Sequence, residues 1–187
     1  MLIETGGGKE PPLEALLTAN GYAIAGRIGE QDDWIERLQD SQADAIVVGA
    51  ATPSRRLLAK IESLSRQEPR PIALFCDEGE TGQINAAVSA GVNALVTGRD
   101  RSETLVPTID LAMAHFKETE KLLKERDHAT EALAERKLIE RAKGIVMKQR
   151  GLSEDEAYKF LRQAAMDRGV RLGRLAASIL ETEELLS

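Results

Sequence analysis

The alternation of short apolar runs with helical patterns in the first 100 residues constrains the fold of this chain more than any other feature. The apolar runs, each typical of a buried strand, cover residues 1–4, 22–28, 45–48, 71–76 and 93–97. The helical patterns between them cover residues 11–20, 32–41, 54–65 and 81–90. Strands that alternate with helices form parallel sheets, and helices cover both faces of such a sheet. We therefore predict a five-stranded parallel sheet with helices on both faces.

From Ser102 onward the pattern is helical and contains no further strand. Ser102 is a suitable residue to cap a helix at its amino end. Apolar residues at helical spacing follow at Leu105, Ile109, Ala112 and Phe116. More than half of the residues from 117 to 141 are charged, so this part cannot be buried. It is either a solvated linker helix or one strand of a coiled coil.

The coiled-coil interpretation predicts a homodimer along this helix. The apolar positions that would hold two copies together are Phe116, Leu123 and Leu133. Polar residues such as Thr119 and Arg126 interrupt the seam between them, which weakens the pattern.

The last 50 residues contain three short helical patterns. Gly151 and Gly169 are typical residues to end the first two, and Ser153 with Glu156 forms a capping-box pattern at the start of the second. The third pattern covers residues 172–180. Apolar residues that can fill a shared core are Ile145, Val146, Ala157, Phe160, Leu161, Ala164, Ala165, Leu172, Leu175, Ala176 and Ile179. We predict a small all-α domain.

The charge of this tail is opposite to that of the rest of the chain. Residues 136–174 hold 11 Lys/Arg and 5 Asp/Glu, a net charge of +6, whereas residues 1–135 hold 14 and 23, a net charge of −9. A basic module on an acidic chain suggests a polyanionic partner, because phosphate contacts dominate nucleic-acid affinity. A helical bundle with a solvated charged face is the alternative.

The tail also carries a family resemblance. The segment from Lys143 to Tyr158, with Leu161-Arg162 and Ala165-Met166 after it, resembles an ANTAR domain. That resemblance implies a three-helix bundle that binds two small hairpins of a nascent transcript and so prevents a terminator from forming. The residues expected to contact RNA are Lys143, Lys148, Arg150, Tyr158, Lys159 and Arg162. Tyr158 could equally pack within the bundle. Met147 and Met166 are expected in the core.

The first half is similar to a response-regulator receiver domain. The resemblance implies an α/β flavodoxin-like five-stranded sheet over residues 1–110, a long helix or coiled coil over 111–133, and the all-α three-helix ANTAR domain over 134–187. The residues that a receiver uses for phosphoryl transfer are absent. Gly49 occupies the position where the acceptor Asp is expected. Gly6, Gly7 and Gly8 occupy the place of the acidic pair that holds Mg²⁺ in a receiver. Cys76 replaces the expected hydroxyl residue, and Thr97 and Gly98 lie where the Lys is expected. We therefore expect a pseudo-receiver with no phosphoacceptor, because Mg²⁺ needs clustered carboxylates.

The chain as a whole is similar to the ANTAR response regulators of nitrate and nitrite assimilation. That similarity implies a cytoplasmic transcription antiterminator, controlled by a ligand-sensing regulatory protein and not by phosphate. We expect no enzymatic activity, metal, cofactor or membrane span. The alternative is a coiled-coil adaptor whose basic tail docks an acidic protein. A DNA-binding regulator controlled by phosphorylation is disfavoured, because Gly49 leaves it without a phosphoacceptor Asp.

Overall fold

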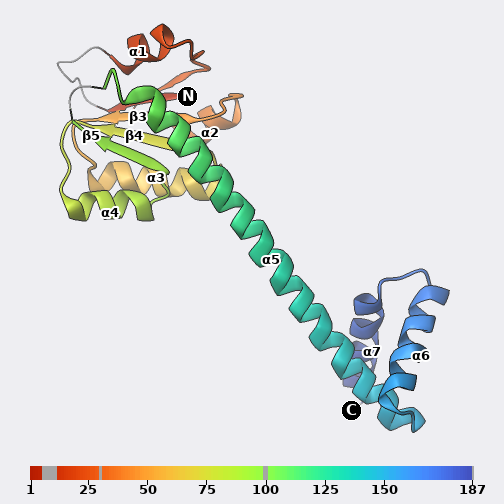
Figure 1. Ribbon diagram of the computed structural model, residues 1–187. Helices are drawn as coiled ribbons and strands as arrows, with labels where there is room; N and C mark the ends of the chain where they lie inside the picture. The colour runs from red at the N-terminus through yellow and green to blue at the C-terminus, as the bar shows by residue number, and fades with distance from the viewer. Residues whose placement is uncertain (6–11, 30, 99–100, 187) are drawn as a thin grey trace. The chain divides into compact units, whose positions relative to one another are not determined.

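The computed structural model describes residues 1–5, 12–29, 31–98 and 101–186, which divide into two compact units at residues 1–120 and 121–187. The first unit is built on a five-stranded sheet (Figure 1). Its strands are β1 (Leu2–Thr5), β2 (Arg27–Ile28), β3 (Ile46–Ala50), β4 (Ile72–Cys76) and β5 (Ala94–Thr97). The helices of the chain are α1 (Leu13–Ala19), α2 (Trp34–Gln39), α3 (Arg55–Gln67), α4 (Thr81–Ser89), α5 (Leu105–Arg150), α6 (Glu154–Asp167) and α7 (Leu172–Leu186).

The sheet is parallel throughout and has the strand order β2-β1-β3-β4-β5, which is the flavodoxin-like order. Every residue of β3 and β4 is buried, as expected for central strands covered on both faces. One apolar cluster joins the sheet to α2, α3 and α4, and a second joins its other face to α1 and the start of α5. The predicted fold class is confirmed.

All five predicted strands are present, but β2 is much shorter than its apolar run. Only Arg27 and Ile28 pair, opposite Leu2 and Ile3 of β1. The residues before them do not join the ladder, and Tyr22 and Ile24 pack partly against the cluster that includes α1 instead. The apolar character of residues 22–28 therefore reflects packing as well as strand pairing.

Most helix boundaries follow the capping signals, but the predicted cap Ser102 lies in a turn before α5 and does not begin the helix. Ser54 accepts a hydrogen bond from the Leu57 backbone amide at 3.2 Å, and Gly151 and Gly169 have the positive φ of 67° and 63° that ends helices. The long helix α5 starts at Leu105, after a turn in which the Leu105 amide bonds to the Arg101 carbonyl at 3.0 Å. It continues into the first tail helix without a break, and α7 extends beyond the predicted residue 180.

The middle of α5 is exposed on every side. Each residue from 117 to 137 is exposed, including Leu122 at 56%, Leu123 at 45% and Leu133 at 55%. A helix of this composition gains no stability from a buried face of its own unit. Among the described residues, no helix is long and apolar enough to cross a bilayer.

The second unit packs the end of α5 against α6 and α7. Small residues at the centre, including Ala142, Ala157 and Ala176, are fully buried and bring the three helices close together. The other buried residues of this core are Val146, Leu161, Ala165 and Leu175. The predicted core positions lie in or against this cluster with one exception, Ile145, which lies outside it.

Candidate nucleic-acid interface

One face of α6 presents large side chains to solvent. Tyr158, Arg162 and Met166 follow one another at four-residue spacing, so they lie on successive turns of the same side of the helix. Tyr158 is 45% exposed and Met166 is 65% exposed. We call these three residues the α6 stripe. Exposed Lys159 lies beside it.

The exposure of two of these residues bears on how their roles were predicted. Tyr158 lies outside the core cluster, so the structure does not place it as a packing residue. The prediction that Met166 belongs to the core is wrong, because the core side of α6 passes through Leu161 and Ala165 and leaves Met166 on the solvent side. Met147 does pack against the core, as predicted.

A second element of this surface is an arginine at the end of α5. The Arg150 guanidinium lies 4.2 Å from the centroid of the Phe160 ring, and Phe160 itself packs against the core of the unit. A cation over the face of an aromatic ring is attracted to it, so Phe160 favours this position of the Arg150 guanidinium. Arg150 and Lys148 are both exposed.

Lys143 differs from the other predicted contact residues. Its side chain is only 10% exposed, and its Nζ donates to Glu154 Oε1 at 2.6 Å and lies 2.5 Å from Glu140 Oε2. Hydrogen bonds to Glu140 and Glu154 raise the pKa of Lys143 above its usual value. The same bond from Lys143 lowers the pKa of Glu154. Lys143 therefore ties α5 to the first turn of α6, and its charge is already engaged inside the protein.

The start of α6 is fixed by the predicted capping box. The Glu156 carboxylate accepts from the Ser153 backbone amide at 2.9 Å and from the Ser153 hydroxyl at 2.6 Å. Both bonds lower the pKa of Glu156, and the bond from the Ser153 hydroxyl has the larger effect. The turn between α5 and α6 is thus held by Lys143 on one side and by Ser153 and Glu156 on the other, which fixes how α6 presents its exposed stripe.

One structural contact in this unit has no signal in the sequence. The Gly173 amide at the start of α7 donates to Glu135 Oε1 at 3.2 Å. A Cβ on Gly173 would lie 2.4 Å from the same oxygen, so any other residue there would displace the Glu135 side chain. Glu135 and Gly173 together set where α7 begins against α5.

The carboxyl edge of the sheet in the first unit lacks the geometry for phosphoryl transfer among its described residues. Gly49 lies near the end of β3, and a Cβ there would lie 2.6 Å from Leu13 Cδ1. Burial raises the pKa of the Cys76 thiol to about 11, although Arg101 opposes the shift. The Asp77 carboxylate is paired with Arg101 at 2.5 Å, and their side chains are only 22% and 11% exposed. The predicted loss of the metal-binding loop at residues 6–8 falls outside the described residues.

No described part of the chain brings together three His, Cys, Asp or Glu side chains in a way that suits a metal ion.

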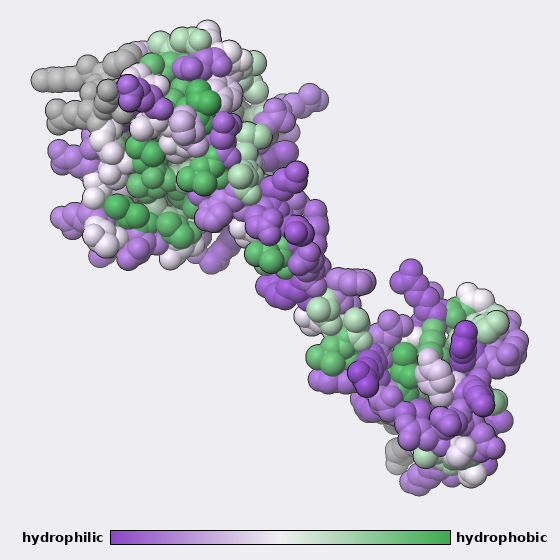
Figure 2. All heavy atoms as spheres, in the orientation of Figure 1, coloured by the Kyte–Doolittle hydropathy of each residue, from purple (hydrophilic) through white to green (hydrophobic). Residues whose placement is uncertain are grey.

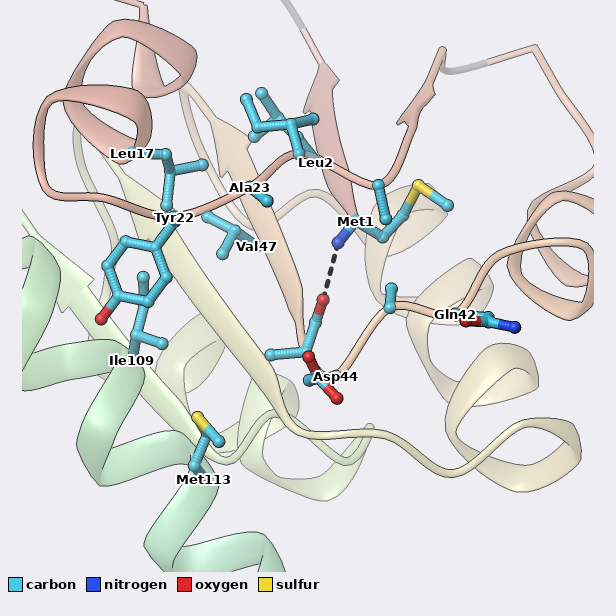
Figure 3. A pocket seen from close by; sticks show the side chains of 14 residues that line it. Met1, Leu2, Leu17, Tyr22, Ala23, Gln42, Asp44, Val47, Ile109 and Met113 are labelled. Atoms are coloured by element: carbon cyan, nitrogen blue, oxygen red, sulfur yellow. Dashed lines mark hydrogen bonds between the residues drawn. The ribbon is translucent and has the colours of Figure 1, made fainter.

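The opposite edge of the sheet holds a pocket of about 360 Å³ (Figure 3). Its lining is mainly apolar and includes Leu17, Tyr22, Ile109 and Met113. Such a lining suits an apolar group and not a phosphoryl group.

The two units differ in the surfaces that they present. Figure 2 shows hydrophilic side chains over most of the visible face of the second unit, with only small apolar areas between them. The exposed cations named above all belong to this unit. The described geometry therefore places a flat aromatic ring, guanidinium planes and ammonium groups on one small helical unit, which is a combination suited to an unpaired nucleic-acid strand.

The tail also matches a known domain family. Residues 127–180 match the ANTAR domain family. The transcriptional regulatory protein PdtaR of Mycobacterium tuberculosis is 29% identical over 170 residues, which cover 91% of this chain and 83% of that protein. The nitrate regulatory protein of Klebsiella oxytoca is 42% identical over 55 residues, or 29% of this chain and 14% of that protein.

Solved structures of response regulators are also similar to the chain. The RcsB response regulator of Salmonella typhimurium aligns with a TM-score of 0.43 and 16% identity over 97% of both chains. The response regulator ChrA of a heme-sensing two-component system aligns with a TM-score of 0.41 and 14% identity, over 98% of this chain and 96% of that one.

Proposed function

We propose that this chain, whose tail matches the ANTAR domain family and whose first unit has the flavodoxin-like strand order, is an RNA-binding transcription antiterminator. It would bind hairpins of a nascent leader transcript and so keep a downstream terminator from forming. The ANTAR match over residues 127–180 supports the class of regulator. The side chains of α6 support RNA as the ligand.

The observation that carries the proposal is the α6 stripe. Single-stranded RNA loops are recognised by stacking of splayed bases on aromatic rings and guanidinium planes, while cations hold the phosphates. Tyr158 and Arg162 offer such planes on adjacent turns, and Tyr158 is 45% exposed. A solvated charged face alone does not require an exposed tyrosine beside an arginine.

The other expected contact residues have different parts in this proposal. Arg150 would add a third stacking plane, because Phe160 fixes its guanidinium. Exposed Lys148 and Lys159 would hold phosphates. Lys143 would act as a positioning residue, since its ammonium is bonded to Glu140 and Glu154 and not directed to a ligand.

We propose that a protein partner, and not phosphorylation, controls the first unit. Gly49 leaves no room for an acceptor carboxylate beside Leu13, and the Asp77 carboxylate is paired with Arg101. A ligand-sensing regulatory protein is the proposed partner. Nitrate or nitrite assimilation is the proposed setting, supported by the similarity of the tail to the Klebsiella oxytoca nitrate regulatory protein.

We also propose that two copies associate through the middle of α5, within residues 111–133. The leucines there are exposed, including the predicted Leu123 and Leu133, whereas Phe116 is half-buried. Leu111, Leu122 and Leu133 recur every eleven residues, so they lie on one side of the helix after about three turns each. Two ANTAR domains in one dimer would suit two hairpins, because linked sites raise the overall affinity.

An Arg162→Ala substitution tests the RNA assignment directly. We expect affinity for a two-hairpin leader RNA to fall at least about 10-fold, since a lost stacking and phosphate contact is worth roughly 1–3 kcal/mol. Arg66→Ala is the matched control, because Arg66 is an exposed helical arginine of the first unit. Equal affinities for both variants, or equal binding of an acidic protein competitor, would favour the adaptor function instead.

A further inference from the structure

A groove of about 340 Å³ lies between α5 and α7 in the second unit, on a side that the α6 stripe does not reach. Its lining comes from both helices and consists of Arg141, Gly144, Ile145, Lys148, Leu180 and Glu183. No residue of α6 takes part. The groove is therefore a separate concave surface on the same small basic domain.

Gly144 is the first indication that this groove receives a ligand. It lies inside α5, where glycine is less favourable than alanine by roughly 1 kcal/mol. Its φ is not positive, and a Cβ built on it meets nothing within 4 Å. Gly173 in the same unit is the opposite case, because there a Cβ would clash with Glu135. Packing inside the protein explains Gly173 but does not explain Gly144.

Ile145 is the second indication. Its hydrophobic spacing predicts a core position, yet it is only partly buried, lies outside the core cluster and lines the groove. Together with the bare backbone at Gly144, it gives the groove an apolar part next to Leu180 of α7. Because Gly144 has no side chain, a planar ring could lie close to the helix backbone there.

The charges of the groove are the third indication. Arg141 and Lys148 are seven residues apart on α5, or about two turns, so they lie on the same side with Gly144 between them. Both are exposed. Glu183 contributes a carboxylate at the α7 side, where it also accepts from Gln149 Nε2 at 3.3 Å. A nucleobase with a phosphate on each side would place its ring on Gly144 and its phosphates near the two cations. The Glu183 carboxylate could accept hydrogen bonds from N–H groups on the edge of the base.

We propose that this groove is a second RNA subsite, which takes one unstacked nucleobase on Gly144 and Ile145 and its flanking phosphates on Arg141 and Lys148. The proposal rests on the RNA-binding function proposed above and adds a second contact surface to the α6 stripe. Two surfaces on different sides of the bundle would let one domain contact two parts of a hairpin, such as a loop base and the adjoining strand.

Gly144→Leu in the full chain is the decisive variant. The substitution fills the groove but should not unfold α5, because the backbone is helical and the added side chain meets no neighbour. We expect affinity for the two-hairpin RNA to fall about 10-fold or more, with a melting temperature equal to or above that of the original chain. Gly144→Ala, which adds one carbon only, should weaken binding less and raise the melting temperature.

Gly82→Leu is the matched control. Gly82 also lies within a helix, α4 of the first unit, and a Cβ there also meets nothing within 4 Å. This variant should bind RNA as the original chain does. Binding by Gly144→Leu that equals the control would overturn the groove proposal.

A scan with abasic loop positions sharpens the test. One position should weaken the original chain but add no further loss in Gly144→Leu, since the groove that takes that base is already filled. Losses that add at every position would contradict the proposal. The outcomes also separate the two proposals: a chain that binds no hairpin RNA overturns both, whereas RNA binding that depends on Arg162 and not on Gly144 overturns the groove alone.

Discussion

The carboxyl edge of the sheet in the first unit and the exposed face of α6 in the second contain similar residue types in opposite environments. At the sheet edge, Arg101 and Asp77 neutralise each other and are largely buried. On α6, Arg162 and Lys159 are exposed and lie beside a half-exposed tyrosine. Charges that satisfy one another stabilise a fold, whereas exposed charges next to a flat ring are available to a ligand. The comparison supports our proposal that the RNA binds to the second unit.

The largest expected effect comes from an attempt to restore receiver chemistry. Gly49→Asp should lower the free energy of unfolding of the first unit by at least about 3 kcal/mol, since the new side chain meets Leu13 and buries a carboxylate. Urea unfolding measures the loss. A stable variant that accepts phosphate from a small phosphodonor would contradict our account of the sheet edge, and Gly82→Asp on the surface of α4 is the control.

The next effect concerns the α6 stripe. Tyr158→Ala combined with Arg162→Ala should weaken binding of hairpin RNA by about 100-fold, because two stacking planes are lost at once. Both side chains are outside the core, so the melting temperature should not change. Fluorescence anisotropy and circular dichroism measure the two quantities. A large fall in melting temperature would mean that these residues stabilise the bundle and do not form a ligand surface.

A smaller effect separates Lys143 from the exposed cations. Lys143→Met should lower the melting temperature of the second unit by several degrees, and loss of RNA binding should follow only to the extent that the unit unfolds. An unchanged melting temperature with RNA binding lost would instead place Lys143 at the ligand. Lys143→Arg, which keeps the charge, is the control.

The same contact predicts a dependence on pH. The lowered pKa of Glu154 means that its contribution is present above its ordinary value of 4.5 and is lost as pH falls through the folded-state pKa. The raised pKa of Lys143 means that its contribution is present below 10.5 and is lost as pH rises through the folded-state pKa. Lys143→Met should therefore reduce both the acid and the alkaline loss of stability. Hydrogen bonds from Ser153 also lower the pKa of Glu156, so that variant should keep part of the acid dependence.

The smallest effect is on salt dependence. Lys148→Gln should reduce the slope of log Kd against log salt concentration by about one, since one phosphate contact is lost. The affinity at a single low salt concentration should change only modestly. An unchanged slope would remove Lys148 from the proposed groove and from the RNA surface.

The sequence predicted the sheet and its helices because their signals are local. Apolar runs bounded by Gly and Pro mark β3 and β4, and the Ser153–Glu156 spacing marks the start of α6. β2 was overestimated because an apolar run does not distinguish a paired strand from a chain that packs against a helix. Tyr22 and Ile24 take the second role.

The details of the tail surface could not be predicted in the same way. Whether Ile145 or Met166 is buried depends on where α7 lies against α5 and α6, and helical periodicity leaves the residues at the border of a face undecided. The partner of Lys143 on α6 is eleven residues away, beyond a turn whose geometry decides whether the two side chains meet. The Glu135 contact to Gly173 spans 38 residues and depends wholly on the packing of the bundle.

The most direct test of the central claim is a gel-shift titration of the intact protein against a two-hairpin leader RNA and a copy with altered loop bases, at one fixed moderate salt concentration. We predict tight binding to the first RNA and binding to the second that is at least about 10-fold weaker, since the exposed rings and guanidinium planes read loop bases. Equal weak binding to both RNAs would contradict the account, because it would reduce the basic tail to a non-selective electrostatic surface.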